Sequence, residues 1–141
     1  MRLAVAETHH DVRVIVMADG DKQGEIHRQL APIGVTVASV RRAAELSQFT
    51  RKHNYYQVAL LPAVLPDSDW WAVWGAISLF DPRPTILVYA HTASFQLWSG
   101  VLEAGGYDVI AEPFTAKELQ RAVLRAAKSF EERYLNEGDD D

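Results

Sequence analysis

Five short apolar runs recur along this chain of 141 residues, and a longer amphipathic segment follows each of them. The runs are rich in β-branched residues, which is typical of strands buried on both faces of a sheet. Regular alternation of strands and helices with short connections predicts a flavodoxin-like, doubly wound α/β fold, in which five parallel strands carry helices on both faces. The predicted strands are residues 12–18, 35–40, 57–61, 85–90 and 109–111, and the predicted helices are residues 22–33, 41–53, 70–79 and 93–104, with a last helix after Thr115.

Polar residues at the expected starts of three helices are suited to capping. We expect Asp21 to cap the helix over 22–33 and Asp69 to cap the helix over 70–79, since Asp is a preferred N-cap residue. Thr115 and Glu118 have the spacing of a capping box, which predicts the start of a long last helix. That helix is expected to fray before Gly138.

The length of the chain suits one domain, which we expect over residues 12–132 after a lead-in of residues 1–11. Residues 133–141 are expected to form a flexible acidic tail. Residues 131–141 carry six acids and one base, so their net charge of −5 equals that of the whole chain and the remainder is neutral. A neutral body offers no basic stripe, and we therefore expect no direct contact with nucleic acid.

The composition also bears on location and cofactors. The chain has no cysteine, which excludes disulfides, thiolate nucleophiles and cysteine metal sites. No apolar run approaches the roughly 20 residues of a membrane span, and nothing reads as a signal peptide. We therefore expect a cytoplasmic protein that does not contact a membrane.

Ligands of doubly wound sheets bind at the carboxyl ends of the strands, so the residues at those ends decide the chemistry. Three stretches near those ends resemble the receiver domains of bacterial two-component response regulators. They are VALLPAVLPDSD at 58–69, PTILVYA at 84–90, and EAGG at 103–106 running on to EPF at 112–114. Together with the fivefold alternation, these stretches extend the resemblance over roughly residues 12–130.

The resemblance implies a site for phosphoryl transfer, which depends on charge neutralisation around the reacting group. In the family, a carboxylate after the third strand accepts the phosphoryl group and acids after the first strand hold magnesium. A Ser or Thr and a Lys, after strands four and five, grip the phosphoryl oxygens. By this resemblance Pro62 takes the acceptor position, Tyr89 the Ser/Thr position and Glu112 the Lys position, while Asp19 and Asp21 remain of the acids.

These departures predict a degenerate site. Pro62 offers no nucleophile, and Glu112 would repel a phosphoryl dianion. Magnesium needs several oxygen ligands in octahedral order, and two acids are too few to hold it. We therefore expect no aspartyl phosphate, no metal and no other cofactor in this site, and no enzymatic activity. The resemblance also implies a cis peptide bond between Glu112 and Pro113.

Other interpretations remain open. The chain could be a phosphorelay receiver with an unusual acceptor such as Asp67, in the loop after the third strand. Asp19 and Asp21 could be the relic of a metal site, although a turn and a helix cap explain them more simply. A flavin-binding protein of the flavodoxin type is disfavoured, because the same two acids would repel a phosphate after the first strand.

Aromatic residues exceed what one inward stripe of a helix can bury. If Trp71, Trp74 and Ile77 face the sheet, then Trp70 and Val73 point elsewhere. Exposed aromatic patches mark interaction surfaces, which favours an interface on the fourth helix over a wholly buried arrangement. The candidate interface residues are Phe95, Leu97, Trp98, Val101 and Trp70.

The sequence thus favours a receiver-like signal-transduction domain that works without phosphorylation, as a protein–protein interaction or dimerisation module. The expected partner is a signalling protein or a transcription regulator. A homodimer through the fourth helix, fifth strand and fifth helix is a further possibility that the resemblance implies.

Overall fold

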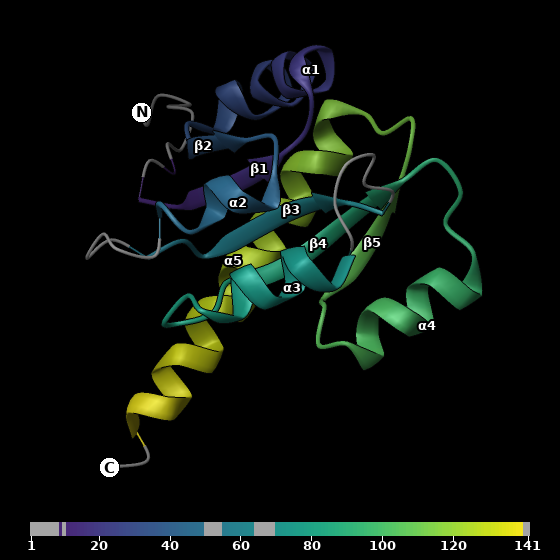
Figure 1. Ribbon diagram of the computed structural model, residues 1–141. Helices are drawn as coiled ribbons and strands as arrows, with labels where there is room; N and C mark the ends of the chain where they lie inside the picture. The colour runs from purple at the N-terminus through teal and green to yellow at the C-terminus, as the bar shows by residue number, and fades with distance from the viewer. Residues whose placement is uncertain (1–8, 10, 50–54, 64–69, 140–141) are drawn as a thin grey trace, which may run out of the picture.

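The computed structural model describes residues 9, 11–49, 55–63 and 70–139 of the chain. Five parallel strands form one sheet in the order β2-β1-β3-β4-β5, as Figure 1 shows. The strands are β1 (Arg13–Met17), β2 (Thr36–Val40), β3 (Val58–Pro62), β4 (Thr85–Ala90) and β5 (Asp108–Ala111). The helices are α1 (Gly20–Leu30), η1 (Ala31–Ile33), α2 (Ala43–Leu46), α3 (Trp70–Ser78), α4 (Phe95–Glu103) and α5 (Ala116–Asp139).

Two apolar cores lie on the two faces of the sheet. Side chains of α1 and α5, such as Ile26 and Val123, share the first core with Val14, Val16 and other strand residues. Helices α2, α3 and α4 cover the opposite face, where their side chains pack against alternate residues of the same strands. The two-sided arrangement explains why the strands read as continuous apolar runs, since every residue of β4 is buried. The predicted doubly wound fold is confirmed.

The start of α1 differs from the expectation. The helix begins at Gly20, and Asp19 rather than Asp21 takes the N-cap position. The backbone carbonyl of Asp19 accepts a hydrogen bond from the amide of Gln23 at 2.7 Å. Asp21 lies in the first turn, where its negative charge still favours the helix dipole. The prediction of Asp21 as the cap was therefore wrong by one turn position or two, because Gly20 has no preference that marks it as helical.

The second and fifth helices also differ in length from the prediction. Helix α2 spans only Ala43–Leu46, whereas residues 41–53 were expected to be helical; residues 50–54 lie outside the described residues. Helix α5 continues to Asp139, past Gly138. Its predicted start is confirmed, because the hydroxyl of Thr115 accepts a hydrogen bond from the amide of Glu118 at 3.1 Å. The predicted domain limits at residues 12 and 132 stay a prediction.

The first described residue belongs to the packed part of the molecule. The amide of His9 donates a hydrogen bond to the carbonyl of Ile33 at 2.8 Å, and its carbonyl accepts one from Val12. Part of the expected lead-in therefore runs beside η1. Among the described helices, including the 24 residues of α5, none is long and apolar enough to cross a membrane.

Candidate functional site

The carboxyl ends of β1, β3, β4 and β5 meet at one edge of the sheet. The order of the strands reverses between β1 and β3, and this switch point is where open α/β sheets place their sites. Pro62 is the last residue of β3 and pairs in register with Tyr89 of β4, and Tyr89 pairs with Ile110 of β5. The edge therefore brings together the strand ends that carry the predicted site residues.

Tyr89 fills the interior of this edge. Its side chain is buried, and its hydroxyl donates a hydrogen bond to the carbonyl of Met17 at 2.7 Å. Its ring meets the ring of Phe114 edge-on, with 6.4 Å between the centroids. Burial raises the pKa of the Tyr89 hydroxyl, and the negative charges of Glu112 and Asp19 raise it further. Tyr89 thus stays neutral and joins β4 to the end of β1.

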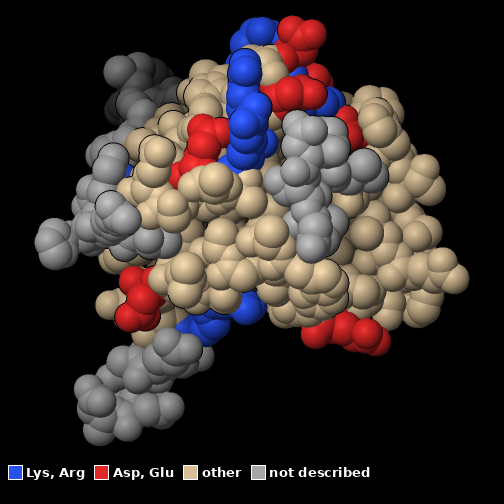
Figure 2. Space-filling view, in the orientation of Figure 1, with Lys and Arg blue, Asp and Glu red and all other residues tan. Residues whose placement is uncertain are grey.

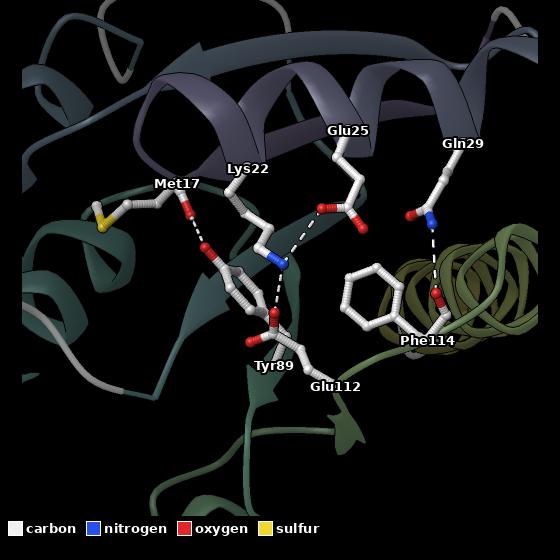
Figure 3. A network of polar contacts seen from close by, with 7 residues as sticks. All are labelled: Met17, Lys22, Glu25, Gln29, Tyr89, Glu112 and Phe114. Atoms are coloured by element: carbon white, nitrogen blue, oxygen red, sulfur yellow. Dashed lines mark hydrogen bonds and ion pairs between the residues drawn. The ribbon is translucent and has the colours of Figure 1, made fainter.

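An ion pair between Lys22 and Glu112 closes the same edge from outside, as Figure 3 shows. Lys22 lies in the first turn of α1, and Glu112 directly follows β5. The carboxylate is largely buried, with 7% of the side chain exposed, and the Lys22 ammonium lies also 3.4 Å from Glu25. The hydrogen bond to Glu112 raises the pKa of Lys22, although burial opposes it. Both groups are therefore charged near neutral pH.

Sequence reasoning named Glu112 but missed Lys22. The expectation was a carboxylate that would face a phosphoryl group without a counterion. In the structure a cation lies beside Glu112, and the Lys22 ammonium also lies 5.7 Å from the centre of the Phe114 ring. The signal in the sequence was weak, because a lysine in the first turn of a helix is usually solvated.

The two acids after β1 are both exposed. Asp19 lies near enough to Tyr89 to raise the pKa of its hydroxyl, so it belongs to the site. Asp21 points to solvent from the first turn of α1. The peptide bond between Glu112 and Pro113 is cis, as the resemblance implied.

Magnesium, which the resemblance implies for this fold, does not fit these residues. The carbonyl of Met17 is taken by the hydroxyl of Tyr89, and the Lys22 ammonium brings a positive charge to the edge. In the described residues, no group of three or more His, Asp or Glu side chains is arranged to hold a metal. Asp19 and Asp21 alone fall short of an octahedral set of oxygen ligands.

Gln23 is a further residue that the sequence did not single out. Its side-chain amide donates to the carbonyls of Val16 and Val40 at 3.0 and 3.3 Å, and approaches that of Ala18 at 3.4 Å. These bonds tie the start of α1 to the ends of β1 and β2. They fix the loop that carries Asp19 and positions Lys22.

The predicted interface residues separate into two groups. Phe95 and Trp98 are exposed by 76% and 42%, with ring centroids 6.0 Å apart, which agrees with a surface role. Leu97 is half-buried, and Val101 is a core residue with 3% exposure, so Val101 is withdrawn from the interface. Val101 lies on the inner face of α4, where it packs on the sheet. The side chain of Trp70 lies outside the described residues.

Helix α3 is rotated relative to the expectation. Val73, Trp74 and Ile77 face the sheet, and Trp71 is exposed by 74%. The indole N–H of Trp74 donates to the carbonyl of Ala104 at 2.9 Å, which joins α3 to the end of α4. The prediction that Trp71 is buried and Val73 is not was wrong, because the burial of the more compact Val73 lets Trp74 reach across to α4.

Comparison with known proteins addresses the fold. No family model matches the sequence, and no curated protein resembles it significantly. Solved receiver domains match the structure closely. One is the signal receiver domain of a protein described as a Luxo repressor from Vibrio parahaemolyticus, with a TM-score of 0.76 and 20% identity over 89% of this chain and 97% of that one. The chain has the receiver fold.

Two other receiver folds show the same agreement. A CheY-like response regulator receiver domain from Methanospirillum hungatei has a TM-score of 0.73 and 20% identity, covering 86% of this chain and 98% of that one. The receiver domain of the sensor histidine kinase PA1611 from Pseudomonas aeruginosa has a TM-score of 0.69 and 23% identity, covering 83% and 98%. The latter has a magnesium ion coordinated in its active site cleft.

The receiver fold brings most of the predicted site residues together. Tyr89, Glu112 and Asp19 surround one point at the carboxyl edge, and Pro62 adjoins Tyr89 in the sheet. Asp21 does not point into this group, and Asp67 lies outside the described residues. At this point of the receiver fold, the chain can hold α1 and the loop after β5 together through charge and hydrogen bonding.

Proposed function

We propose that this chain is a receiver-like interaction module that works without an aspartyl phosphate. The observation that carries the proposal is the ion pair between Lys22 and Glu112 at the carboxyl edge of the sheet. In a working receiver the loop after β5 supplies a cation to a phosphoryl group. Here that loop supplies an anion, and α1 supplies the cation that neutralises it.

The energetics of a phosphoryl group at this edge support the proposal. A dianion placed beside Glu112 would meet a buried carboxylate and would compete for the one neighbouring ammonium. Separating Lys22 from Glu112 would leave the carboxylate buried and unpaired, which costs several kcal/mol in comparable sites, about 3–5. The ion pair thus opposes the phosphoryl chemistry that the fold otherwise serves.

The residues at the ends of β3 and β4 support the same conclusion. Pro62 ends β3 without a nucleophilic side chain, and the hydroxyl of Tyr89 is already bound to the carbonyl of Met17. Tyr89 thereby fills space beside Pro62 that a smaller hydroxyl would leave open. We propose accordingly that the chain catalyses no reaction and binds no metal.

What remains is a rigid α/β body with exposed aromatic side chains on one helix. Phe95 and Trp98 offer the kind of surface that anchors protein interfaces. We therefore assign the chain to cytoplasmic signal transduction, with a signalling protein or a transcription regulator as its partner. A fixed site implies that partner concentration, rather than phosphorylation, sets its state.

The experiment is incubation of the full chain with acetyl phosphate and magnesium, followed by intact mass measurement. We expect no gain of a phosphoryl group by the native chain. A double variant, Pro62→Asp with Glu112→Lys, restores an acceptor and a cation at the positions that the resemblance assigns to them. It is the matched control, and its labelling would show that the conditions suffice.

Phosphorylation of the native chain would overturn the proposal. The Asp67→Asn variant then identifies the acceptor. Loss of the added mass in that variant would establish the alternative, a phosphorelay receiver that uses Asp67. Retention of the mass would place the phosphoryl group elsewhere in the chain.

A further inference from the structure

A groove of about 350 Å³ runs between α3 and α4 on the side of the sheet opposite α1 and α5. Trp71 and Trp74 line it from α3, and Leu97 and Gly100 are among the residues that line it from α4. Its volume falls at the lower end of the range for pockets that take a ligand or a large side chain. The groove lies on the α3 flank of α4, away from the carboxyl edge residues Lys22 and Glu112.

The two helices that form the groove carry almost no charge. Residues 70–80 and 84–102 contain no Lys, Arg, Asp or Glu, so Glu103 is the first charged residue of α4 and also its last residue. Figure 2 shows the corresponding uncharged area over α3 and α4. Helices at a solvent-facing surface usually carry charges on their outer face. An uncharged pair of helices indicates a surface that is covered by an equally uncharged partner.

Large apolar side chains are exposed on this surface. Trp71 and Phe95 are exposed by 74% and 76%, and together they present roughly 300 Å² of apolar area, since an aromatic side chain offers about 150–250 Å². Trp98 and Leu102 add further exposed area on α4. This approaches the patch sizes at which monomers expose functional surface, and with its surroundings it can supply most of the about 800 Å² per partner of a standard interface.

We propose that the occupant of this groove is a second copy of the chain, in a twofold dimer formed by the α3–α4 faces. A twofold interface brings the same patch of both copies together, so each patch must complement itself. Here the patch holds both parts that this requires, an exposed aromatic side chain at the rim, Trp71, and an apolar groove beside it. The absence of charge on both helices removes like-charge repulsion between the two copies.

This interface differs from the one that the sequence led us to expect. That expectation used α4, β5 and α5, and therefore the flank of α4 that carries Trp98. The groove uses the opposite flank, which Gly100 lines. The inference rests on the proposed function, because it names the partner of the interaction module.

The two glycines of α3 and α4 make the test sharp. A Cβ built at Gly100 meets no atom within 4 Å, so Gly100→Leu should fill the groove without disturbing the fold of one copy. Trp71→Glu places a charge at the rim through a side chain that is largely exposed. The matched control for that charge is Leu79→Glu, since Leu79 is exposed by 71% just after α3 and does not line the groove.

The measurement is sedimentation equilibrium of the full chain across a concentration series. We expect the native chain to approach the mass of two copies. Gly100→Leu and Trp71→Glu should each raise the dissociation constant at least ~30-fold, the effect of a hot-spot residue. Leu79→Glu and Trp98→Ala should change it by less than about threefold. Circular dichroism melts of each variant check that the fold is kept.

Two outcomes would overturn the proposal. One is a native chain that stays monomeric at every concentration, which would assign the groove to a different protein. The other is a dimer that Trp98→Ala dissociates and Gly100→Leu does not, which would move the interface to the other flank of α4. Neither outcome bears on phosphoryl uptake, so failure of the dimer and failure of the proposed function remain distinguishable.

Discussion

The hydroxyl of Tyr89 connects two strands that are not neighbours in the sheet. It leaves β4, passes the end of β3 and donates to the carbonyl of Met17 at the end of β1. The ring around it is buried against Phe114, so water does not replace this donor readily. A single hydroxyl therefore helps to close the carboxyl edge.

Replacement of Tyr89 by Phe should lower the free energy of unfolding by about 1–3 kcal/mol, because the carbonyl of Met17 loses its buried donor. Urea denaturation of both chains measures the difference. Tyr107→Phe is the control at a more exposed tyrosine, where a change within about 0.5 kcal/mol is expected. Equal stability of the native chain and Tyr89→Phe would contradict a structural role for the hydroxyl.

The stability should also fall at alkaline pH. The pKa values of Lys22 and Tyr89 are both raised in the folded chain, so each group holds its proton more firmly there than when unfolded. Their contribution is present below the unfolded pKa values, about 10, and is lost as pH rises through the folded ones. Urea denaturation between pH 8 and about 11 should show this decline.

The Glu112→Gln variant separates the two groups. It removes the hydrogen-bonded anion that raises the pKa of Lys22, and leaves the burial of Tyr89 in place. We expect a shallower decline of stability with pH than in the native chain. An identical slope would mean that the ion pair contributes nothing to the pH dependence.

At the scale of elements, the junction between α4 and β5 depends on two glycines. Gly105 has a φ of 98°, a conformation that favours glycine, and its amide bonds the carbonyl of Leu102 at 3.0 Å. Gly106 donates to the carbonyl of Val101 at 2.8 Å. A Cβ at Gly106 would overlap the side chain of Val101 and come within 3.3 Å of Trp74. The helix therefore ends where the chain must pass close to its own last turn.

Gly106→Ala should lower the free energy of unfolding by about 1–3 kcal/mol, the usual cost of overpacking. Gly75→Ala in α3 is the matched control, because a Cβ there meets no atom within 4 Å. That change should stabilise the chain by up to about 1 kcal/mol through helix propensity. Denaturation in urea compares the two, and a tolerated Gly106→Ala would show that the junction can relax.

At the scale of the whole molecule, the central strand β3 supports both cores. Leu60 packs in the core with α1 and α5, and Leu61 packs in the core with α2, α3 and α4. Both side chains are at most 1% exposed. Adjacent residues on opposite faces are equally buried only when helices cover both faces of a sheet.

Leu60→Ala and Leu61→Ala should therefore cost similar amounts, about 2–5 kcal/mol each, from lost apolar contacts and the cavities left behind. Urea denaturation monitored by circular dichroism gives both values. Val37→Ala on β2 provides the comparison at a less buried position of the sheet, with a smaller expected loss. A large loss for only one of the two leucines would contradict equal packing on the two faces.

The alternation of apolar runs and amphipathic segments was sufficient to predict the sheet, its parallel strands and its two helical layers. The strand over Thr85–Ala90 and the cap at Thr115 were predicted at the right residues, because burial of a strand and capping of a helix depend on neighbours in sequence. Tyr89, Glu112 and Pro62 were placed at the correct edge for a related reason, since strand ends follow from strand positions.

The pairing of side chains across the edge was decided by the tertiary structure alone. Lys22 and Glu112 are 90 residues apart, and only the order of the strands brings α1 beside the loop after β5. The rotation of α3 and the burial of Val101 were decided in the same way, because several faces of each helix are apolar and packing selects one. Local periodicity determines which elements form, whereas the contacts between distant elements require their final arrangement.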